Sequence, residues 1–327
     1  MLRDVEVAVI GGSSMGTALA HVAAKSGHSA ALWCSDSASA RQVAERFNGA
    51  GRGTDEAPVR VTHVIADVVR DAALVSLAVP SHQFRETARS LASLSMTDRA
   101  LLSSTKGFEP ASHDRMSEIL AQETGAVAVG AIAGANITPD MLTGRLTTLV
   151  VASRVAEVGA AAKRCLESPQ LRVRLEEDLL SIELAAALKN VVAVGVGIAT
   201  GLDLGFNARS IVFACGLEEI TALGVALGAT PRAFAGLAGA GDLFLTASSP
   251  ESLNRRLGIE LGRGARLAEI VAQLPEVPEG IGSVRACRAL ARRHGVRLPI
   301  AEVVAAILEG ECDARAIEAA LGETPCA

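Results

Sequence analysis

The chain has 327 residues, of which 50% are hydrophobic and 20% are charged. This composition is typical of a globular protein rather than a disordered one, and the length allows two domains with separate cores. The formal net charge of −5 argues against the basic surface by which proteins bind nucleic acids.

The first half of the chain alternates short apolar runs with helical stretches. Several runs are continuously apolar, which is typical of parallel strands covered by helices on both faces. The pattern predicts an α/β fold with a Rossmann-like, doubly wound sheet, formed by a dinucleotide-binding domain at 1–180. The expected strands are Val5–Ile10, Ala30–Trp33, Leu74–Val79, Ala100–Ser103, Ala126–Ala131, Thr147–Ala152 and Leu171–Leu175.

The second half changes character at about Ser181. Apolar residues there recur at helical spacing, and Gly or Pro separates the segments, so an all-helical substrate and catalytic domain is predicted at 181–327. The longest apolar stretch, Ala185–Thr200, is broken by two polar residues and is judged too short to span a bilayer. The acidic N-terminal start does not fit a signal peptide. We therefore expect a cytoplasmic protein that contacts neither membrane nor nucleic acid.

Metal binding is not indicated. The histidines and cysteines show no HxxxH, HExxH or CxxC spacing, which are the usual arrangements of metal ligands. We expect no metal.

A glycine-rich loop follows the first expected strand and leads into a helix. Such a loop turns tightly and presents backbone N–H groups and a helix N-terminus to a pyrophosphate. In the usual G-x-G-x-x-G pattern the middle position is glycine, and here it is serine. The alternative is a strand-to-helix turn without a ligand, but the position after an apolar strand favours a dinucleotide. The loop residues are Gly11, Gly12, Ser13, Ser14, Met15 and Gly16.

The end of the second expected strand bears on the choice between NAD and NADP. We place Trp33 and Ser35 among the cofactor-binding residues. Asp36 could accept the ribose hydroxyl of NAD or could cap the next helix, whereas Arg41 could favour the extra phosphate of NADP. The sequence leaves both cofactors open.

A Lys-Asn pair interrupts the apolar run of the second half. Lys189 and Asn190 lie between Leu188 and Val191. A buried ammonium without a partner is costly, so such a group is normally paired, shifted in pKa, or used in chemistry.

These features and several others together resemble the bacterial-type NAD(P)-dependent glycerol-3-phosphate dehydrogenase family, over nearly the whole chain. Each segment alone is modest evidence, and their order and spacing are strong. The segments are Gly16–Ala20, Val79–His82, Ser104–Glu109, Ala187–Val191, Gly205–Arg209, Gly239–Leu243 with Thr246, Asn254–Arg256 and Pro278–Gly280.

The resemblance implies reduction of dihydroxyacetone phosphate to sn-glycerol 3-phosphate by a homodimer, with NAD or NADP as cofactor. Lys189 would be the proton donor, with Lys106 nearby, Asp242 orienting Lys189 and Asn190 as a neutral hydrogen-bonding group. Burial and the second ammonium would lower the pKa of a lysine towards neutrality. The implied substrate-binding residues are Gly134, Asn136, Thr246, Ser252 and Asn254. The further implied cofactor contacts are Pro80, Lys106, Thr138, Arg255, Val277 and Glu279.

Taken singly, these residues have structural explanations. Lys106 could be a solvated loop lysine, Asp242 a helix cap, and the segment Asn254–Arg256 a solvated helix face. Lys189 is the hardest to explain in this way, because its neighbours on both sides are apolar.

The chain departs from the family pattern where the substrate is expected. Leu253 stands where the family usually has an arginine that grips the phosphate, and a guanidinium fork suits a phosphate where leucine offers nothing. Ala135 and Asn136 replace a proline and a hydroxyl residue, and Cys215 stands where an arginine is frequent. Two alternatives therefore remain: a diverged member that reduces another small ketone or aldehyde, and a nicotinamide-binding protein without turnover.

Overall fold

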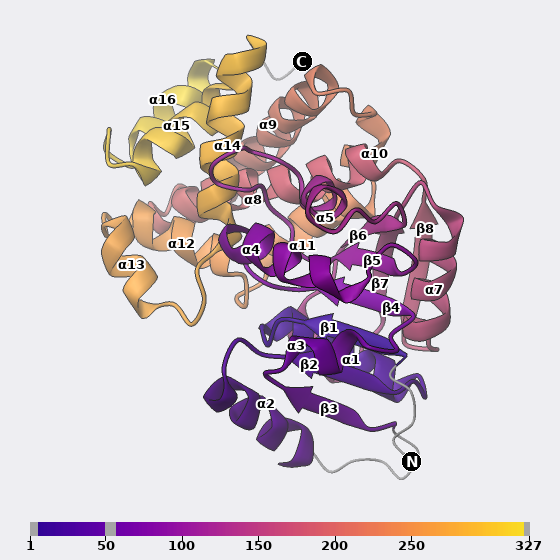
Figure 1. The fold of residues 1–327 in the computed structure, drawn as a ribbon. Helices are drawn as coiled ribbons and strands as arrows, with labels where there is room; N and C mark the ends of the chain where they lie inside the picture. The colour runs from indigo at the N-terminus through magenta and orange to yellow at the C-terminus, as the bar shows by residue number, and fades with distance from the viewer. Residues whose placement is uncertain (1–5, 50–56, 324–327) are drawn as a thin grey trace. The chain divides into compact units, whose positions relative to one another are not determined.

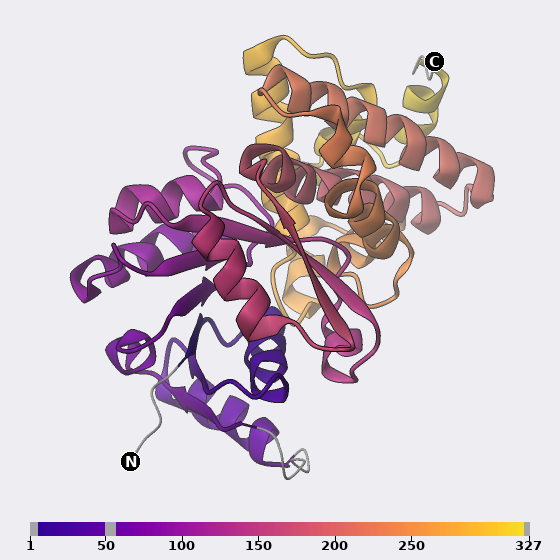
Figure 2. The same cartoon turned by 90° about the vertical axis from the view of Figure 1, so that its right-hand side faces the viewer.

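The computed structural model describes residues 6–49 and 57–323, so Val5 of the first expected strand lies outside the described residues. The chain forms two compact units (Figures 1 and 2). One contains the residues up to Thr105 together with Asp114–Leu179, and the other contains Lys106–His113 together with the residues from Leu180 onward. The short segment around Lys106 thus belongs to the second unit, although the boundary expected near residue 180 put it in the first.

The first unit, called the sheet unit here, contains an eight-stranded sheet of order β3-β2-β1-β4-β5-β6-β7-β8. All neighbouring strands are parallel except β6 and β7. The predicted Rossmann-like fold is confirmed. The strands are β1 Val7–Ile10, β2 Ala30–Trp33, β3 Val59–Thr62, β4 Leu74–Leu77, β5 Ala100–Ser103, β6 Val129–Ala133, β7 Thr147–Ala152 and β8 Leu171–Glu176.

Alternate residues of the strands face two separate apolar cores. One core packs side chains of α1, α2, α6 and α7 against residues such as Val9 and Leu32. The other packs α3, α4 and α5 against residues such as Ile10 and Leu77. The period of two in a strand places neighbouring residues on opposite faces, which explains the continuously apolar runs. The helices are α1 Ser14–Lys25, α2 Ser37–Gly49, α3 Ile65–Val69, α4 Ser81–Leu91, α5 Met116–Thr124, α6 Thr138–Leu142 and α7 Ala156–Leu166, with a 3₁₀ turn η1 at Ala92–Leu94.

Strand β3 was missed by the sequence analysis. It lies at the edge of the sheet, and all four of its residues are half-buried. Its composition, Val-Arg-Val-Thr, therefore lacks the continuous apolar run that marks the inner strands.

The second unit, called the helical unit here, contains helices and no strand in its described residues from Leu180 onward, as expected for this half of the chain. Its elements are α8 Leu179–Gly201, α9 Gly205–Ala226, α10 Pro231–Ala235, the π-helical turn η2 Leu237–Gly241, α11 Asp242–Ser248, α12 Leu253–Gly262, α13 Leu267–Gln273, α14 Glu279–His294, α15 Pro299–Leu308 and α16 Ala316–Glu323.

Two helices of this unit, α8 and α12, touch backbone to backbone. A Cβ atom at Gly197 of α8 would lie 2.5 Å from the Arg255 carbonyl oxygen, and one at Gly258 of α12 would lie 2.1 Å from that of Val194. Only glycine permits this approach. The crossing brings the start of α12 against the middle of α8, where the Lys-Asn pair lies.

Helix α8 has 23 residues and is apolar enough to cross a membrane by length and composition. The argument that the apolar stretch is too short was therefore wrong, because the helix begins six residues before Ala185. Of its most apolar 18-residue window, however, 94% is buried inside the protein. The helix is thus placed as the core of the helical unit.

Candidate active site

A buried cluster of charged and hydroxyl side chains lies in the helical unit. The Asp242 carboxylate accepts from Lys106 Nζ at 2.8 Å through Oδ2, and its Oδ1 lies 3.3 Å from Lys189 Nζ. Lys189 Nζ also donates to Thr246 Oγ1 at 2.6 Å, and that hydroxyl donates to the Asp242 carbonyl. The side chains of Asp242 and Lys189 are 2% and 5% exposed, and that of Lys106 is 14% exposed. Sequence reasoning grouped these four residues, and the structure brings them together.

The local backbone explains how the acid reaches this position. Asp242 begins α11 directly after the π-helical turn η2, a rare element that is frequently found at functional sites. A Cβ at Gly239 within this turn would lie 2.1 Å from the Phe234 carbonyl oxygen, so the tight turn requires glycine. Thr246 follows Asp242 by one helical turn, which places both side chains on the same face of α11.

The electrostatics of the cluster affect Lys189 most. Burial lowers the pKa of Lys189 from 10.5 to about 8, Asp242 acts in the opposite direction, and Lys106 lowers it further. The order of these causes agrees with the expectation from the sequence that burial and a second ammonium would bring this lysine towards neutrality. A lysine with this pKa can give up or take a proton near physiological pH.

A chain of amide hydrogen bonds ties the cluster to two other helices. Asn190 Nδ2 donates to the Lys106 carbonyl at 3.1 Å and to Ser283 Oγ at 3.3 Å. Asn190 Oδ1 accepts from Asn254 Nδ2 at 2.9 Å, and Asn254 Oδ1 accepts from the Gly280 amide at 2.8 Å. Asn190 therefore fixes the backbone of Lys106, 84 residues earlier in the chain. Asn254 was expected at the substrate, but both polar atoms of its side chain make hydrogen bonds to Asn190 and Gly280.

Ser283 was missed by the sequence analysis. It is fully buried in α14, one turn after Glu279. The only signal was a small polar residue close behind the Pro278–Gly280 segment.

The glycine-rich loop joins β1 to α1 in the sheet unit. Gly11 has φ +125°, and a Cβ there would lie 2.6 Å from the Ala78 carbonyl oxygen. A Cβ at Gly16 would lie 1.9 Å from the Gly11 carbonyl oxygen. Ser13 caps α1, because its hydroxyl accepts from the Gly16 amide at 3.2 Å and donates to the Ala78 carbonyl at 2.7 Å. The serine in place of the middle glycine thus has a structural role.

The end of β2 shows what Asp36 does in the fold. Asp36 Oδ1 accepts from the amides of Ala38 and Ser39, both at 2.9 Å, so Asp36 caps the start of α2. These hydrogen bonds lower its pKa from 3.8 to about 2. Ser35 donates to the same carboxylate, and Trp33 donates to the His63 carbonyl. The capping role does not prevent the exposed carboxylate from accepting another hydrogen bond.

The other expected substrate and cofactor residues of the sheet unit lie at the ends of its strands. Gly134 has φ +92° directly after β6, and Asn136 is buried with its Nδ2 donating to the Ala133 carbonyl. Thr138 begins α6, and Pro80 precedes α4. The carboxyl ends of strands are where ligands bind in doubly wound sheets.

The remaining expected residues of the helical unit lie at helix starts. Ser252 caps α12 through the Arg255 amide at 3.2 Å, and Leu253 is the first residue of that helix. Val277 is 47% exposed, and Glu279 begins α14. The Arg255 side chain lines a cavity of its own rather than joining the Lys189 cluster.

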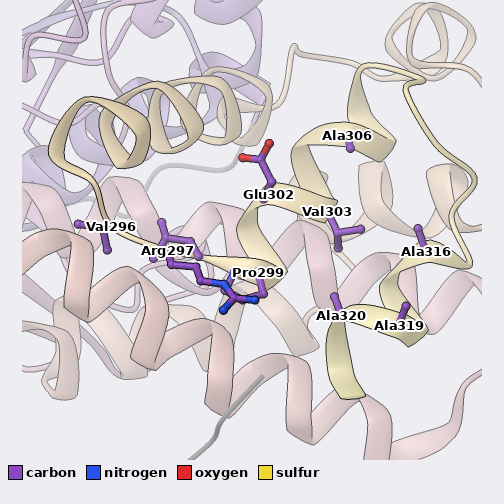
Figure 3. A pocket seen from close by; sticks show the side chains of 10 residues that line it. Val296, Arg297, Pro299, Glu302, Val303, Ala306, Ala316, Ala319 and Ala320 are labelled. Carbon is purple, nitrogen blue, oxygen red and sulfur yellow. The ribbon is translucent and has the colours of Figure 1, made fainter. Parts of the chain in front are cut away.

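A different cavity, of about 470 Å³, lies between α15 and α16. Figure 3 shows its lining, in which Val303 and Ala306 of α15 lie opposite Ala316 and Ala319 of α16. The lining is mainly alanine and valine and contains none of the expected site residues. Within residues 6–49 and 57–323, no group of three or more His, Cys, Asp and Glu side chains could hold a metal ion.

Comparison with known proteins decides the family. The model of the NAD-dependent glycerol-3-phosphate dehydrogenase N-terminus matches residues 6–158, and that of the C-terminus matches residues 178–318. A glycerol-3-phosphate dehydrogenase [NAD(P)+] of Stenotrophomonas maltophilia is 37% identical over 314 residues, covering 94% of this chain and 91% of the relative. The chain belongs to the glycerol-3-phosphate dehydrogenase family.

Further members of this family match the chain over nearly its whole length. The glycerol-3-phosphate dehydrogenase [NAD(P)+] of Moorella thermoacetica is 37% identical, covering 95% of each chain. The crystal structure of glycerol-3-phosphate dehydrogenase from Coxiella burnetii superposes with a TM-score of 0.89 at 28% identity, covering 98% of both chains. The family resemblance stated from the sequence motifs is confirmed.

Proposed function

We propose that the protein reduces dihydroxyacetone phosphate to sn-glycerol 3-phosphate with NADH or NADPH, and that Lys189 donates the proton. The observation that carries this proposal is the buried Lys189–Asp242–Lys106 cluster in a chain of this family. Its relatives are named glycerol-3-phosphate dehydrogenases [NAD(P)+], which supports this reaction and does not favour the alternatives of another ketone or of binding without turnover.

The hydrogen bonds of Lys189 support its role as the acid. An ammonium has three N–H donors. Thr246 Oγ1 takes one, and Asp242 Oδ1 lies in position for a second. The third has no acceptor among the described residues, so Lys189 can direct it at a substrate oxygen. As negative charge develops on that oxygen during reduction, the ammonium stabilises it and then transfers the proton. The carboxylate of Asp242 keeps Nζ in place throughout.

The loop between β1 and α1 fits the pyrophosphate of a dinucleotide. At Gly11 and Gly16 a Cβ would collide with backbone, so the loop is held tight against the start of α1. The positive end of the helix dipole at the start of α1 favours an anion there. When bound, the nicotinamide cofactor supplies the hydride that reduces the ketone carbon. The expected contacts Trp33, Ser35, Pro80, Thr138 and Glu279 remain proposals.

The chain lacks the arginine that the family usually provides for the substrate phosphate. Leu253 offers no charge, and losing a charge-assisted bidentate contact costs about 2–4 kcal/mol, or about 30- to 1000-fold in kcat/KM. Lys106 is the more exposed of the two ammoniums. We therefore assign Lys106 a contact to the substrate phosphate, alongside its ion pair with Asp242. Gly134, Asn136, Thr246 and Ser252 remain the other proposed substrate residues, and Asn254 is proposed to hold Asn190 in position.

The test is cofactor oxidation, followed at 340 nm, by the purified wild-type protein and its Lys189→Met and Leu253→Arg variants. We expect wild type to reduce dihydroxyacetone phosphate. NADH and NADPH are tested separately as the hydride donor. Lys189→Met is expected to lose 100- to 10,000-fold in kcat while binding the cofactor normally, about the contribution of a general acid. Leu253→Arg is expected to lower KM for dihydroxyacetone phosphate.

Two outcomes would contradict this assignment. Wild type could fail to oxidise either cofactor with dihydroxyacetone phosphate but accept an unphosphorylated ketone. Alternatively, Lys189→Met could retain full kcat. As a matched control, Lys163→Met changes an exposed lysine of the sheet unit and should alter neither constant.

The homodimer implied by the resemblance and the cytoplasmic location expected from the sequence are also proposals. The burial of α8 inside the protein supports a location in aqueous surroundings. Sedimentation equilibrium of the purified chain tests the dimer, and fractionation of the native host's cells tests the location.

A further inference from the structure

A second cavity of the helical unit, of about 500 Å³, is lined by residues of α8, α9, α11 and α12. This volume lies within the range of small-molecule sites. Its aromatic content is unusual for this chain, which has seven phenylalanines and no tyrosine. Phe206, Phe213 and Phe244 all line it. Phe206 is 80% exposed and Phe244 is 68% exposed, so much of their apolar surface remains to be covered.

The charged residues of this cavity are both arginines. Arg209 and Arg255 line it, and no acidic side chain is among the lining residues. The Arg255 guanidinium has neither an ion pair nor a hydrogen bond within residues 6–49 and 57–323. Arg209 donates through Nε to the Gly205 carbonyl and lies with its guanidinium 4.2 Å from the centre of the Phe206 ring. In a protein of net charge −5, this is a local surplus of positive charge.

Several other arginines of the helical unit are paired with carboxylates. Arg285 pairs with Glu309, and Arg288 pairs with Glu302 and Glu311. Like Arg232, Arg256 and Arg293, the two cavity arginines have no ion pair among the described residues, and they differ from those three in lining a cavity with aromatic side chains. A bound anion would provide the negative charge for these two arginines, and the phenylalanine rings beside them would cover the apolar part of the same ligand.

From this combination we infer a binding site for a small organic anion, with a sulfonate, carboxylate or phosphate head and a flat apolar body. The head lies on Arg209 and Arg255, and the body packs on the phenylalanine rings. This assignment replaces the cofactor contact that the sequence suggested for Arg255. It does not depend on the reaction proposed above, because the cavity is lined by residues of α8, α9, α11 and α12 other than those of the Lys189 cluster.

The cavity is distinct from the Lys189 cluster. On α8 its lining residues are Val196 and Thr200, seven and eleven positions after Lys189, or about 10 and 16 Å along the helix axis. On α11 it is lined by Phe244, Ala247 and Ser248, whereas the cluster uses Asp242 and Thr246.

A second copy of the chain is a less suitable occupant. If this cavity lay on the axis of a two-fold dimer, the two arginines of one copy would approach those of the other. Like charges brought together without acids between them disfavour association. A small anion meets no such penalty.

The test is isothermal titration of the full-length protein with naphthalene-2-sulfonate, with 2-naphthol as the neutral probe of equal shape. Phenyl phosphate and benzoate then compare the three head groups. Wild type is expected to bind one sulfonate per chain and 2-naphthol at least tenfold more weakly. Arg209→Gln is expected to weaken sulfonate binding tenfold or more, and Arg209→Lys to recover part of the loss. The matched control Arg232→Gln removes an exposed arginine that does not line the cavity.

A second variant keeps the test decisive if Arg209→Gln fails to fold. Ser210 is exposed at the cavity, and Ser210→Trp is expected to fill it and abolish binding without lowering Tm. Lack of saturable binding by wild type at millimolar sulfonate overturns the inference, as does equal binding by all variants. A wild-type dimer that Ser210→Trp converts to a monomer in sedimentation also overturns it, because the cavity then belongs to an interface between copies.

Discussion

The pKa of Lys189 makes a prediction about how pH affects the two directions of the reaction. Burial lowers this pKa from 10.5 to about 8. Reduction of dihydroxyacetone phosphate requires the protonated lysine, and oxidation of glycerol 3-phosphate requires the neutral one. We therefore expect kcat/KM for reduction to fall above pH 8 and kcat/KM for oxidation to rise towards a plateau over the same range.

The size of the effect follows from the position of the pKa. With a pKa of about 8, roughly 90% of Lys189 carries its proton at pH 7 and roughly 10% at pH 9. Reduction should therefore be about ninefold slower at pH 9 than at pH 7. An ordinary lysine would stay almost fully protonated across this range and would give no change.

Two variants should move this transition in opposite directions. Asp242 raises the pKa of Lys189, and Lys106 lowers it. Asp242→Asn is therefore expected to shift the transition below pH 8, and Lys106→Met to shift it above pH 8. The assay is initial-rate kinetics in both directions from pH 6 to 10 at constant ionic strength. A reduced cofactor deuterated at the transferred position shows whether the chemical step is being measured.

The reasoning would be refuted by a profile for reduction that stays flat to pH 9. It would equally be refuted if both variants shifted the transition in the same direction, since the cause would then lie outside the charges on Lys106 and Asp242. A transition that survives Lys189→Met would assign the titration to another group.

Three further predictions concern stability and cofactor binding. The free energy of unfolding of wild type should rise relative to that of Lys189→Met between about pH 8 and about pH 10.5, because the folded chain releases the Lys189 proton at a lower pH than the unfolded chain does, and urea unfolding at several pH values measures the difference. Gly16→Ala should weaken dinucleotide binding at least tenfold in a fluorescence titration, because its Cβ would lie 1.9 Å from a loop carbonyl oxygen, whereas Gly322→Ala, with nothing within 4 Å, should bind normally. Glu219→Ala should lower the free energy of unfolding in urea by about 3 kcal/mol, because two buried amides at the start of α15 lose their acceptor. Glu218→Ala changes the exposed neighbour and should lower it little. Equal losses in the two variants would contradict this reason.

The parts of the fold that could be predicted are those set by local patterns. Inner strands such as β1 and β5 are buried on both faces, so their apolar runs stand out in the sequence. Edge strand β3 is half-buried and gives only a weak signal. Lys189 could be singled out because an ammonium within an apolar helix contradicts its surroundings.

The parts that could not be predicted depend on contacts between distant residues. The Lys106 segment follows a strand of the sheet unit, yet it belongs to the helical unit, where Asn190 holds its carbonyl and Asp242 its ammonium. In the sequence, Ser13 is only a departure from a glycine motif. In the structure its hydroxyl caps α1 and donates to the carbonyl of Ala78, the residue that follows β4. For Ser283 the only sequence signal is its position close behind the Pro278–Gly280 segment. In each case the decisive partner is supplied by packing.

The same burial that makes the Lys189 site costly also makes it an acid near neutral pH. If Lys189 were exposed, its pKa would stay near 10.5, and it would give up its proton too reluctantly to exchange it in both directions. If it were buried without Asp242, it would lose its charge and could not stabilise a developing alkoxide. The Asp242 carboxylate keeps the charge, and the apolar surroundings of α8 limit how strongly it is held. The glycine contacts between α8 and α12 then seat Asn254 against Asn190, and through it fix Lys106 beside the same carboxylate. The reactivity of one ammonium therefore depends on glycine contacts between two helices.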